Sequence, residues 1–83
     1  MTLEQFQALK AGDIIMWKAR SFPEDEISDN LLLVLENQLL DGDLFEGQHE
    51  LKTRMLQTTS TLPSASNEWY IHEDTHDEIS LVA

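Results

Sequence analysis

Between residues 9 and 19 the sequence reads Leu9-Lys10-Ala11-Gly12-Asp13-Ile14-Ile15-Met16-Trp17-Lys18-Ala19. A glycine and an aspartate are followed there by two isoleucines, a methionine and a tryptophan. This composition is typical of a strand that the chain enters from a turn. We therefore expect a strand over residues 13–19.

A short helix is expected immediately before this strand. Thr2-Leu3-Glu4-Gln5 is a capping-box sequence, in which the first hydroxyl accepts from the fourth amide and the fourth side chain reaches back. Apolar residues then recur on one helical face, at Leu3, Phe6 and Leu9. Gly12 is the residue type that commonly follows a helix end. The pattern predicts a helix over residues 3–10 whose apolar face docks on the rest of the chain.

The region after the strand contains two contrasting segments. Residues 20–30 are rich in acidic and turn-forming residues, which predicts an exposed loop. Residues 31–35 are wholly apolar, and such a run fits either a buried strand or a piece of buried helix. We favour a strand, because the run stops after five residues. The alternative is a helix over residues 31–40 capped by Asp29-Asn30.

The remaining elements follow from glycines, alternation and polar segments. We expect a tight turn at Asp41-Gly42, a further turn at Gly47, an alternating strand over residues 50–59, a loop over 60–67, a strand over 68–72, a polar turn over 73–77 and a last strand over 78–82.

The run from Leu9 to Trp17 resembles the opening of small SH3-like barrel domains, which often read Leu-x-x-Gly-Asp-Ile/Val into the first strand. Trp69-Tyr70, followed by a polar turn and Ile79-Ser80-Leu81-Val82, is similar to their closing pair of strands. The resemblance implies a mainly β fold, a small SH3-like barrel of about five strands with a short N-terminal helix. Small acidic barrels of this kind are also similar to accessory proteins of bacteriophages. The resemblance carries no chemistry.

Length, charge and cysteine content limit the possible functions. Eighty-three residues fit a single domain over residues 1–83, and 16 acidic against 5 basic residues give a net charge of −11. That charge argues against direct nucleic-acid binding and against docking on an anionic membrane. The chain has no cysteine, so disulfides, thiolate metal sites and a cysteine nucleophile are excluded. With no apolar run near 18 residues and no basic-then-apolar leader, we expect a cytoplasmic protein.

The acidic residues gather in clusters, one of which holds Glu24, Asp25, Glu26 and Asp29. Carboxylates spaced like phosphates can occupy a basic nucleic-acid site on another protein. We therefore interpret this cluster as a partner-binding surface. The alternative is that the charge serves only solubility.

The string His72-Glu73-Asp74-Thr75-His76 satisfies H-E-x-x-H. In zinc proteases this spacing works because positions i and i+4 of an α-helix bring both imidazoles to one metal. Here the flanking residues favour a strand and the string itself reads as a polar turn, so we expect no metal site. His72 and His76 are the candidate ligands of the alternative interpretation, a metal-dependent hydrolase.

Trp69 and Tyr70 must point to opposite faces if they lie on a strand. One of them is then at least partly exposed, and an exposed aromatic side chain is a natural anchor for an interface. We therefore add both residues to the predicted partner-binding set.

These observations lead to one main hypothesis and two alternatives. The main hypothesis is a non-enzymatic, cofactor-free module that engages a basic surface of a partner protein, acting as an inhibitor or a nucleic-acid mimic. The first alternative is an accessory subunit of a larger assembly such as a virion, and the second is the hydrolase. For a phage protein the expected location is the host cytoplasm or the virion.

Overall fold

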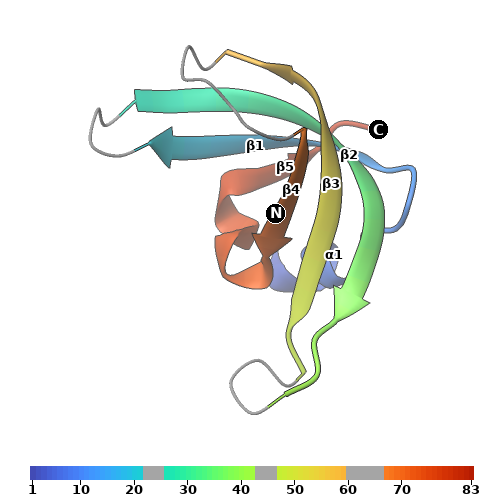
Figure 1. The fold of residues 1–83 in the computed structure, drawn as a ribbon. Helices are drawn as coiled ribbons and strands as arrows, with labels where there is room; N and C mark the ends of the chain where they lie inside the picture. The colour runs from blue at the N-terminus through green and yellow to red at the C-terminus, as the bar shows by residue number, and fades with distance from the viewer. Residues whose placement is uncertain (22–25, 43–46, 60–66) are drawn as a thin grey trace.

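The computed structural model of the chain describes residues 1–21, 26–42, 47–59 and 67–83. Five antiparallel strands form one sheet in the order β4-β3-β2-β1-β5 (Figure 1). The elements in chain order are α1 (Leu3–Gln7), β1 (Ile14–Ser21), β2 (Glu26–Leu39), β3 (His49–Thr58), β4 (Glu68–His72), the 3₁₀ helix η1 (Glu73–Glu78) and β5 (Ile79–Leu81). The chain is therefore mainly β with a short N-terminal helix, as the sequence predicts.

The capping box forms at the start of α1, where Thr2 and Gln5 bond reciprocally at 2.9 and 3.1 Å. The helix ends at Gln7, earlier than predicted. The side-chain amide of Asn37 on β2 donates to three main-chain carbonyls at this end, those of Phe6, Gln7 and Leu9. The Asn37 side chain thus donates hydrogen bonds to carbonyl groups that would accept from main-chain N–H groups if the helix were longer.

The loop predicted over residues 20–30 is wrong at both of its ends, because β1 continues to Ser21 and β2 begins at Glu26. Residues 22–25 of that prediction lie outside the described residues. The polar composition misled the prediction because two polar residues, Ser28 and Asn30, are buried on the inner face. The Asn30 amide donates to the Trp17 carbonyl at 3.1 Å and its oxygen accepts from Thr58 at 2.6 Å. These bonds replace the water contacts that such a residue would have in a loop.

Residues 31–35 lie in the middle of β2, so the strand prediction is confirmed and the helix over 31–40 is wrong. The β2–β3 ladder shifts register twice, leaving Leu56 on β3 and Leu35 on β2 without an opposite residue. Such bulges bend a strand and increase its twist. β2 and β3 are accordingly strongly curved in Figure 1.

The curvature brings distant strands together on the concave side of the sheet. Trp17 on β1 and Trp69 on β4 meet edge to face, with ring centroids 5.4 Å apart and planes at 87°. These strands are separated by β2 and β3, so in a flat sheet they would lie roughly 14 Å apart. The sheet therefore curls around its interior. The ladder is not closed among the described residues, because β4 and β5 are its two ends and η1 joins them.

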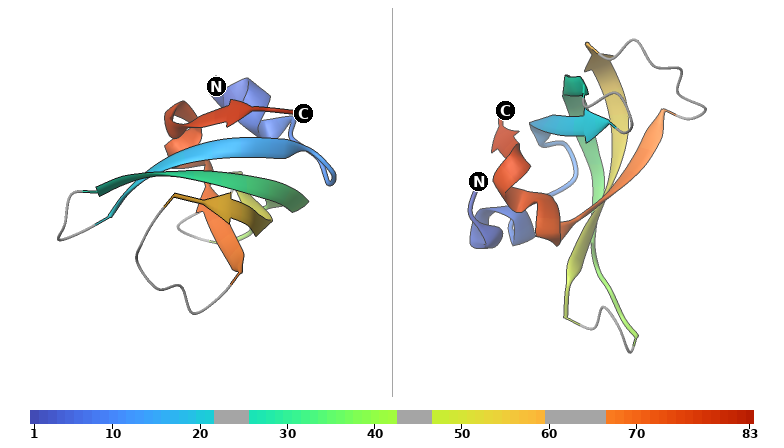
Figure 2. Two further views of the ribbon diagram at one scale, coloured as in Figure 1. Left: turned by 90° about the horizontal axis from the view of Figure 1, so that it is seen from above. Right: turned by 90° about the vertical axis from the view of Figure 1, so that its left-hand side faces the viewer.

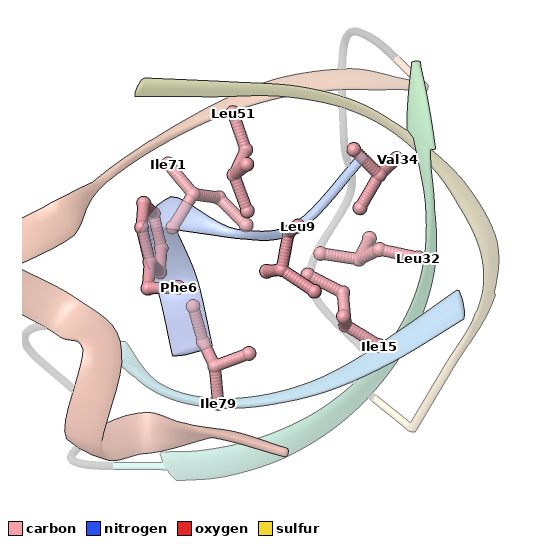
Figure 3. Close-up of a cluster of buried hydrophobic side chains, with 8 residues drawn as sticks. All are labelled: Phe6, Leu9, Ile15, Leu32, Val34, Leu51, Ile71 and Ile79. Carbon is pink, nitrogen blue, oxygen red and sulfur yellow. The ribbon is translucent and has the colours of Figure 1, made fainter. Parts of the chain in front are cut away.

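Eight apolar side chains fill the interior of the curl and point toward one another in Figure 3. They come from α1 and the residues after it, and from all five strands: Phe6, Leu9, Ile15, Leu32, Val34, Leu51, Ile71 and Ile79. Figure 2 shows α1 and η1 side by side, on the concave side of the sheet. Of the predicted apolar face, Phe6 and Leu9 are buried, so its docking is confirmed for these two residues, whereas Leu3 is 40% exposed.

The later elements mostly agree with the sequence. The alternation of the strand predicted over 50–59 holds through Leu51, Thr53 and Met55, and then ends at the bulge. The prediction of a tight turn at Asp41-Gly42 is wrong. The main-chain N–H of Leu40 donates to the Gln48 carbonyl, and the Leu40 carbonyl accepts from the N–H of Gly47, so the connection is longer than two residues. The polar turn over 73–77 is a 3₁₀ helix, and the last strand is confirmed over Ile79–Leu81. Residues 60–66 of the predicted loop lie outside the described residues.

Candidate functional site

The acidic cluster predicted from the sequence is only partly described. Glu24 and Asp25 lie outside the described residues. Glu26 is the first residue of β2, and Asp29 is exposed three positions further along the strand. The main chain of Asp29 bonds to Thr59 in both directions, at 2.9 and 3.0 Å, which fixes the carboxylate on paired strand. The role of this cluster in partner binding stays a prediction.

Trp69 and Tyr70 point to opposite faces of the edge strand β4. Trp69 is half-buried against Trp17 on the concave side, and its carbonyl accepts a 2.9 Å bond from the Thr53 hydroxyl. Tyr70 faces outward and is 59% exposed. The prediction that these two side chains point to opposite faces is therefore confirmed. Tyr70 is the more accessible of the two to a partner.

The H-E-x-x-H string does not form an α-helical metal site. His72 is the last residue of β4 and the N-cap of η1, where its Nδ1 accepts from the Asp74 amide at 3.3 Å. His76 lies within η1, and its Nδ1 donates to the Met1 carbonyl at 2.9 Å. In a 3₁₀ helix, positions four apart point about 120° away from each other. In the described part of the chain, no three His, Asp or Glu side chains lie close enough to hold a metal ion.

Glu73, the central residue of that string, has a structural environment that the sequence did not reveal. It is 8% exposed, and its Oε2 accepts from the Gln7 amide and from the main-chain N–H of His49, each at 3.1 Å. The hydrogen bond from Gln7 is the main reason that the pKa of Glu73 lies below its usual range. Glu73 thus joins α1, β3 and η1 as a carboxylate that is held charged.

A neighbouring polar contact continues this network into the sheet. The ring Nδ1 of His49 lies 2.8 Å from the Asn37 Oδ1, and the amide group of Asn37 holds the end of α1. Asp13 forms a separate small cluster, in which the backbone N–H of Lys10 lowers the pKa of its carboxyl group. Both sets of contacts position α1 against the curled sheet.

Four of the remaining exposed carboxylates lie on α1 and η1. We call this surface the acidic end; its described members are Glu4, Asp74, Asp77 and Glu78. Lysine and arginine ion pairs in the described residues reach Asp13 and Glu68 but none of these four carboxylates. The helix and η1 pack directly against each other. The acidic end is therefore a group of exposed carboxylates on a fixed support, without a lysine or arginine ion pair among the described residues. Positive groups near it are the Met1 ammonium and Lys18, which line one hollow with Asp77 and Glu78, and, when its ring is protonated, His72, whose Nδ1 lies 3.3 Å from the Asp74 Oδ2.

An apolar cleft of about 460 Å³ lies close to the acidic end, between α1 and β5. Its walls include Met1, Leu9 and Leu81, with the Lys10–Asp13 ion pair at its margin. Met1 also contacts η1, since its amino group donates to the carbonyls of His76 and Ile79. The carboxylates of the acidic end and this cleft therefore lie on neighbouring parts of the surface, on either side of Met1 and Ser80. Neither was predicted from the sequence. Asp74, Asp77 and Glu78 are neighbours in the chain, but only the fold brings Glu4 and the two walls of the cleft to them.

Comparison of the chain with family models, with curated proteins and with solved structures gives no match in any of the three. No helix in the described residues is long and apolar enough to cross a membrane. The functional argument therefore depends on the geometry and charge of this chain.

Proposed function

We propose that this chain is a non-enzymatic protein-binding module whose acidic surface engages a basic surface of a partner protein. The observation that carries the proposal is the acidic end. Its four carboxylates are exposed and have no lysine or arginine partner in the described residues. An excess of charge of one sign on one surface attracts the opposite sign and accelerates encounter.

The adjoining cleft supports a partner that presents an apolar side chain among its cations. Charged groups give on-rate and specificity, whereas a buried apolar anchor contributes more to affinity. The cleft of about 460 Å³ is large enough for such an anchor, and it shares Met1 and Ser80 with a second hollow that Asp77 and Glu78 line. An inhibitor or a nucleic-acid mimic is the form of module that this arrangement suits best, because both compete for basic sites.

The finer description of the fold is part of the proposal. Two features support an SH3-like barrel. β5 returns to pair with β1, and the long, curved β2 of fourteen residues pairs with both β1 and β3. The contact between Trp17 and Trp69 across the interior also supports such a barrel. A bacteriophage accessory role, with a location in the host cytoplasm or the virion, remains the context that we propose for this module.

The test uses capture of partners on the immobilised chain at low salt, followed by binding kinetics with each captured protein. Neutralising the acidic end as Glu4→Gln, Asp74→Asn, Asp77→Asn and Glu78→Gln should slow association by about tenfold or more. It should also flatten the decline of affinity with salt, since exposed charges are screened over about 8 Å at physiological ionic strength. Added DNA should compete if the module mimics nucleic acid.

A matched variant separates the two acidic surfaces. Glu24→Gln, Asp25→Asn and Glu26→Gln neutralises three of the four carboxylates of the cluster predicted from the sequence and leaves the acidic end intact. If only this variant loses binding, the site belongs to residues 24–26. If neither variant changes the association rate at low salt, an acidic binding surface is ruled out.

An assembly role is the second candidate, and a different surface favours it. Tyr70 is exposed on the outer face of the sheet, away from the acidic end.

A further inference from the structure

The outer, convex face of β2 is more apolar than a solvated strand face requires. Leu32 and Val34 are 0% and 1% exposed on the concave side. Their neighbours in the run, Leu31, Leu33 and Leu35, are only half-buried and lie outside the core cluster. Antiparallel strands with one solvated face alternate apolar and polar residues, whereas strands covered on both faces are apolar throughout. The run over residues 31–35 therefore has the composition of a strand that is covered on both faces.

The neighbouring strand extends this surface. In the β1–β2 register, Ile14 lies opposite Leu33 and Met16 lies opposite Leu31. We call these residues the convex patch: Ile14, Met16, Leu31, Leu33 and Leu35. A hollow of about 220 Å³ indents one side of it, between Met16, Leu31 and Gln57. Tyr70 stands at the other side, on β4.

The charges around the convex patch balance, unlike those of the chain as a whole. One end of the patch has Lys18 opposite Asp29, and the other end has Lys52 opposite Glu36. Between them, Glu68 pairs with Arg54 at 3.7 Å and with Lys52 at 3.9 Å. These side chains are three cations and three carboxylates and sum to zero, in a chain of net charge −11. Glu50 is the next outward-facing residue beyond this area.

We propose that the convex patch docks against the same patch of a second copy of this chain, giving a face-to-face two-fold dimer. Two copies that each carry −11 repel wherever their carboxylates meet, so they can approach only through a neutral surface. A two-fold axis places the same surface on both partners. Apolar side chains then meet apolar side chains, and each copy brings both signs of charge to the rim. Sheets that pack in this way lie about 10 Å apart.

The charge balance is the reason that we assign a second copy of this chain as the partner of the convex patch. A basic protein is drawn to the carboxylates of the acidic end, and a face that sums to zero gives it no such attraction. Self-association and basic-partner binding therefore use different surfaces, and they respond to salt in opposite directions. Salt screens the repulsion between two copies of net charge −11 and should strengthen the dimer.

The test is sedimentation equilibrium of the full chain, from about 1 μM to about 1 mM and at low and high sodium chloride. The expected result is a mass moving from 9.5 kDa toward twice that value, at lower concentration in high salt. Leu33→Glu should raise the dimer dissociation constant by about 100-fold or more, because the dimer would bury an unpaired carboxylate in each half.

Two further variants keep the test decisive. Leu39→Glu changes the same residue type on the same strand, at a side chain that is 64% exposed beyond the patch, and it should leave the dissociation constant unchanged. Tyr70→Ala removes an exposed side chain with little effect on folding and should weaken the dimer by about tenfold. A chain that stays at 9.5 kDa throughout overturns the proposal, as does a dimer that Leu33→Glu and Tyr70→Ala leave intact.

Discussion

The two faces of β2 differ in a way that hydropathy does not anticipate. The concave face combines the fully buried Leu32 with Asn30, a polar residue that is also 0% exposed. The convex face carries Leu31 and Leu33, which are only half-buried, next to the exposed Asp29. The inside of this sheet is therefore partly polar and its outside is partly apolar.

Burial in this sheet is decided by hydrogen-bond partners as well as by side-chain type. Asn30 is tolerated inside because its amide and carbonyl groups bond to Trp17, Ser28 and Thr58. The convex leucines have no equivalent enclosure among the described residues, since the core cluster lies wholly on the other face. A polar side chain with fixed partners can thus be more deeply buried than a leucine one position away.

The largest loss of stability should come from replacing Leu32, the apolar residue on the concave face of β2. Leu32→Ala should lower the free energy of unfolding by about 2–5 kcal/mol, because it leaves a cavity in a closed core. The matched change Leu33→Ala, one residue along and on the convex face, should cost less than about 1.5 kcal/mol in the monomer. Urea denaturation at low protein concentration measures both. Equal losses would remove the distinction between the faces.

The polar member of the concave face should come next. Asn30→Ala should cost about 1–3 kcal/mol, because the Trp17 carbonyl and the Thr58 hydroxyl lose a buried partner. Asp29→Ala is the control, since this side chain is exposed on the other face and should change stability by less than about 0.5 kcal/mol. An Asn30 variant as stable as the control would show that the bonds inside the curl contribute nothing net.

The buried carboxylate should give a smaller effect that depends on pH. The pKa of Glu73 is lowered in the folded chain, so its contribution to stability is fully present above the unfolded value near 4.5. The contribution disappears as pH falls through the lower folded pKa. Glu73→Gln should therefore flatten the acid limb of the curve of unfolding free energy against pH. Part of the slope should remain, because the pKa of Asp13 is lowered as well. An unchanged acid limb would contradict this role.

The smallest effect is expected from the exposed carboxylates beside Glu73. Asp77→Asn should shift the free energy of unfolding by less than about 0.5 kcal/mol. The shift should favour the folded state slightly at low salt, because the substitution removes one charge from a chain of net charge −11. Thermal unfolding at two salt concentrations is sufficient to see it. A large loss of stability would mean that the acidic end is part of the support and not a free surface.

Local patterns were enough to predict many elements of this fold. The capping box at Thr2 and Gln5, the strand after Gly12 and the opposed directions of Trp69 and Tyr70 all follow from neighbours in the chain. Each depends on contacts within a few residues or on the two-residue period of a strand. The loop prediction failed over residues 26–30 for the same reason, since nothing local shows that Asn30 forms hydrogen bonds inside the curled sheet.

The mainly β class, the order of the elements and the excess of negative charge all follow from the residues along the chain. Only the tertiary structure decided which side of β2 faces the core, because an uninterrupted apolar run gives no alternation from which to choose. It also decided which carboxylates are bound and which are exposed. Glu73 and Asp77 look alike in the sequence, yet one meets Gln7 and His49 from distant segments and the other meets solvent. Contacts between distant residues form only when the sheet curls, so no pattern along the chain contains them.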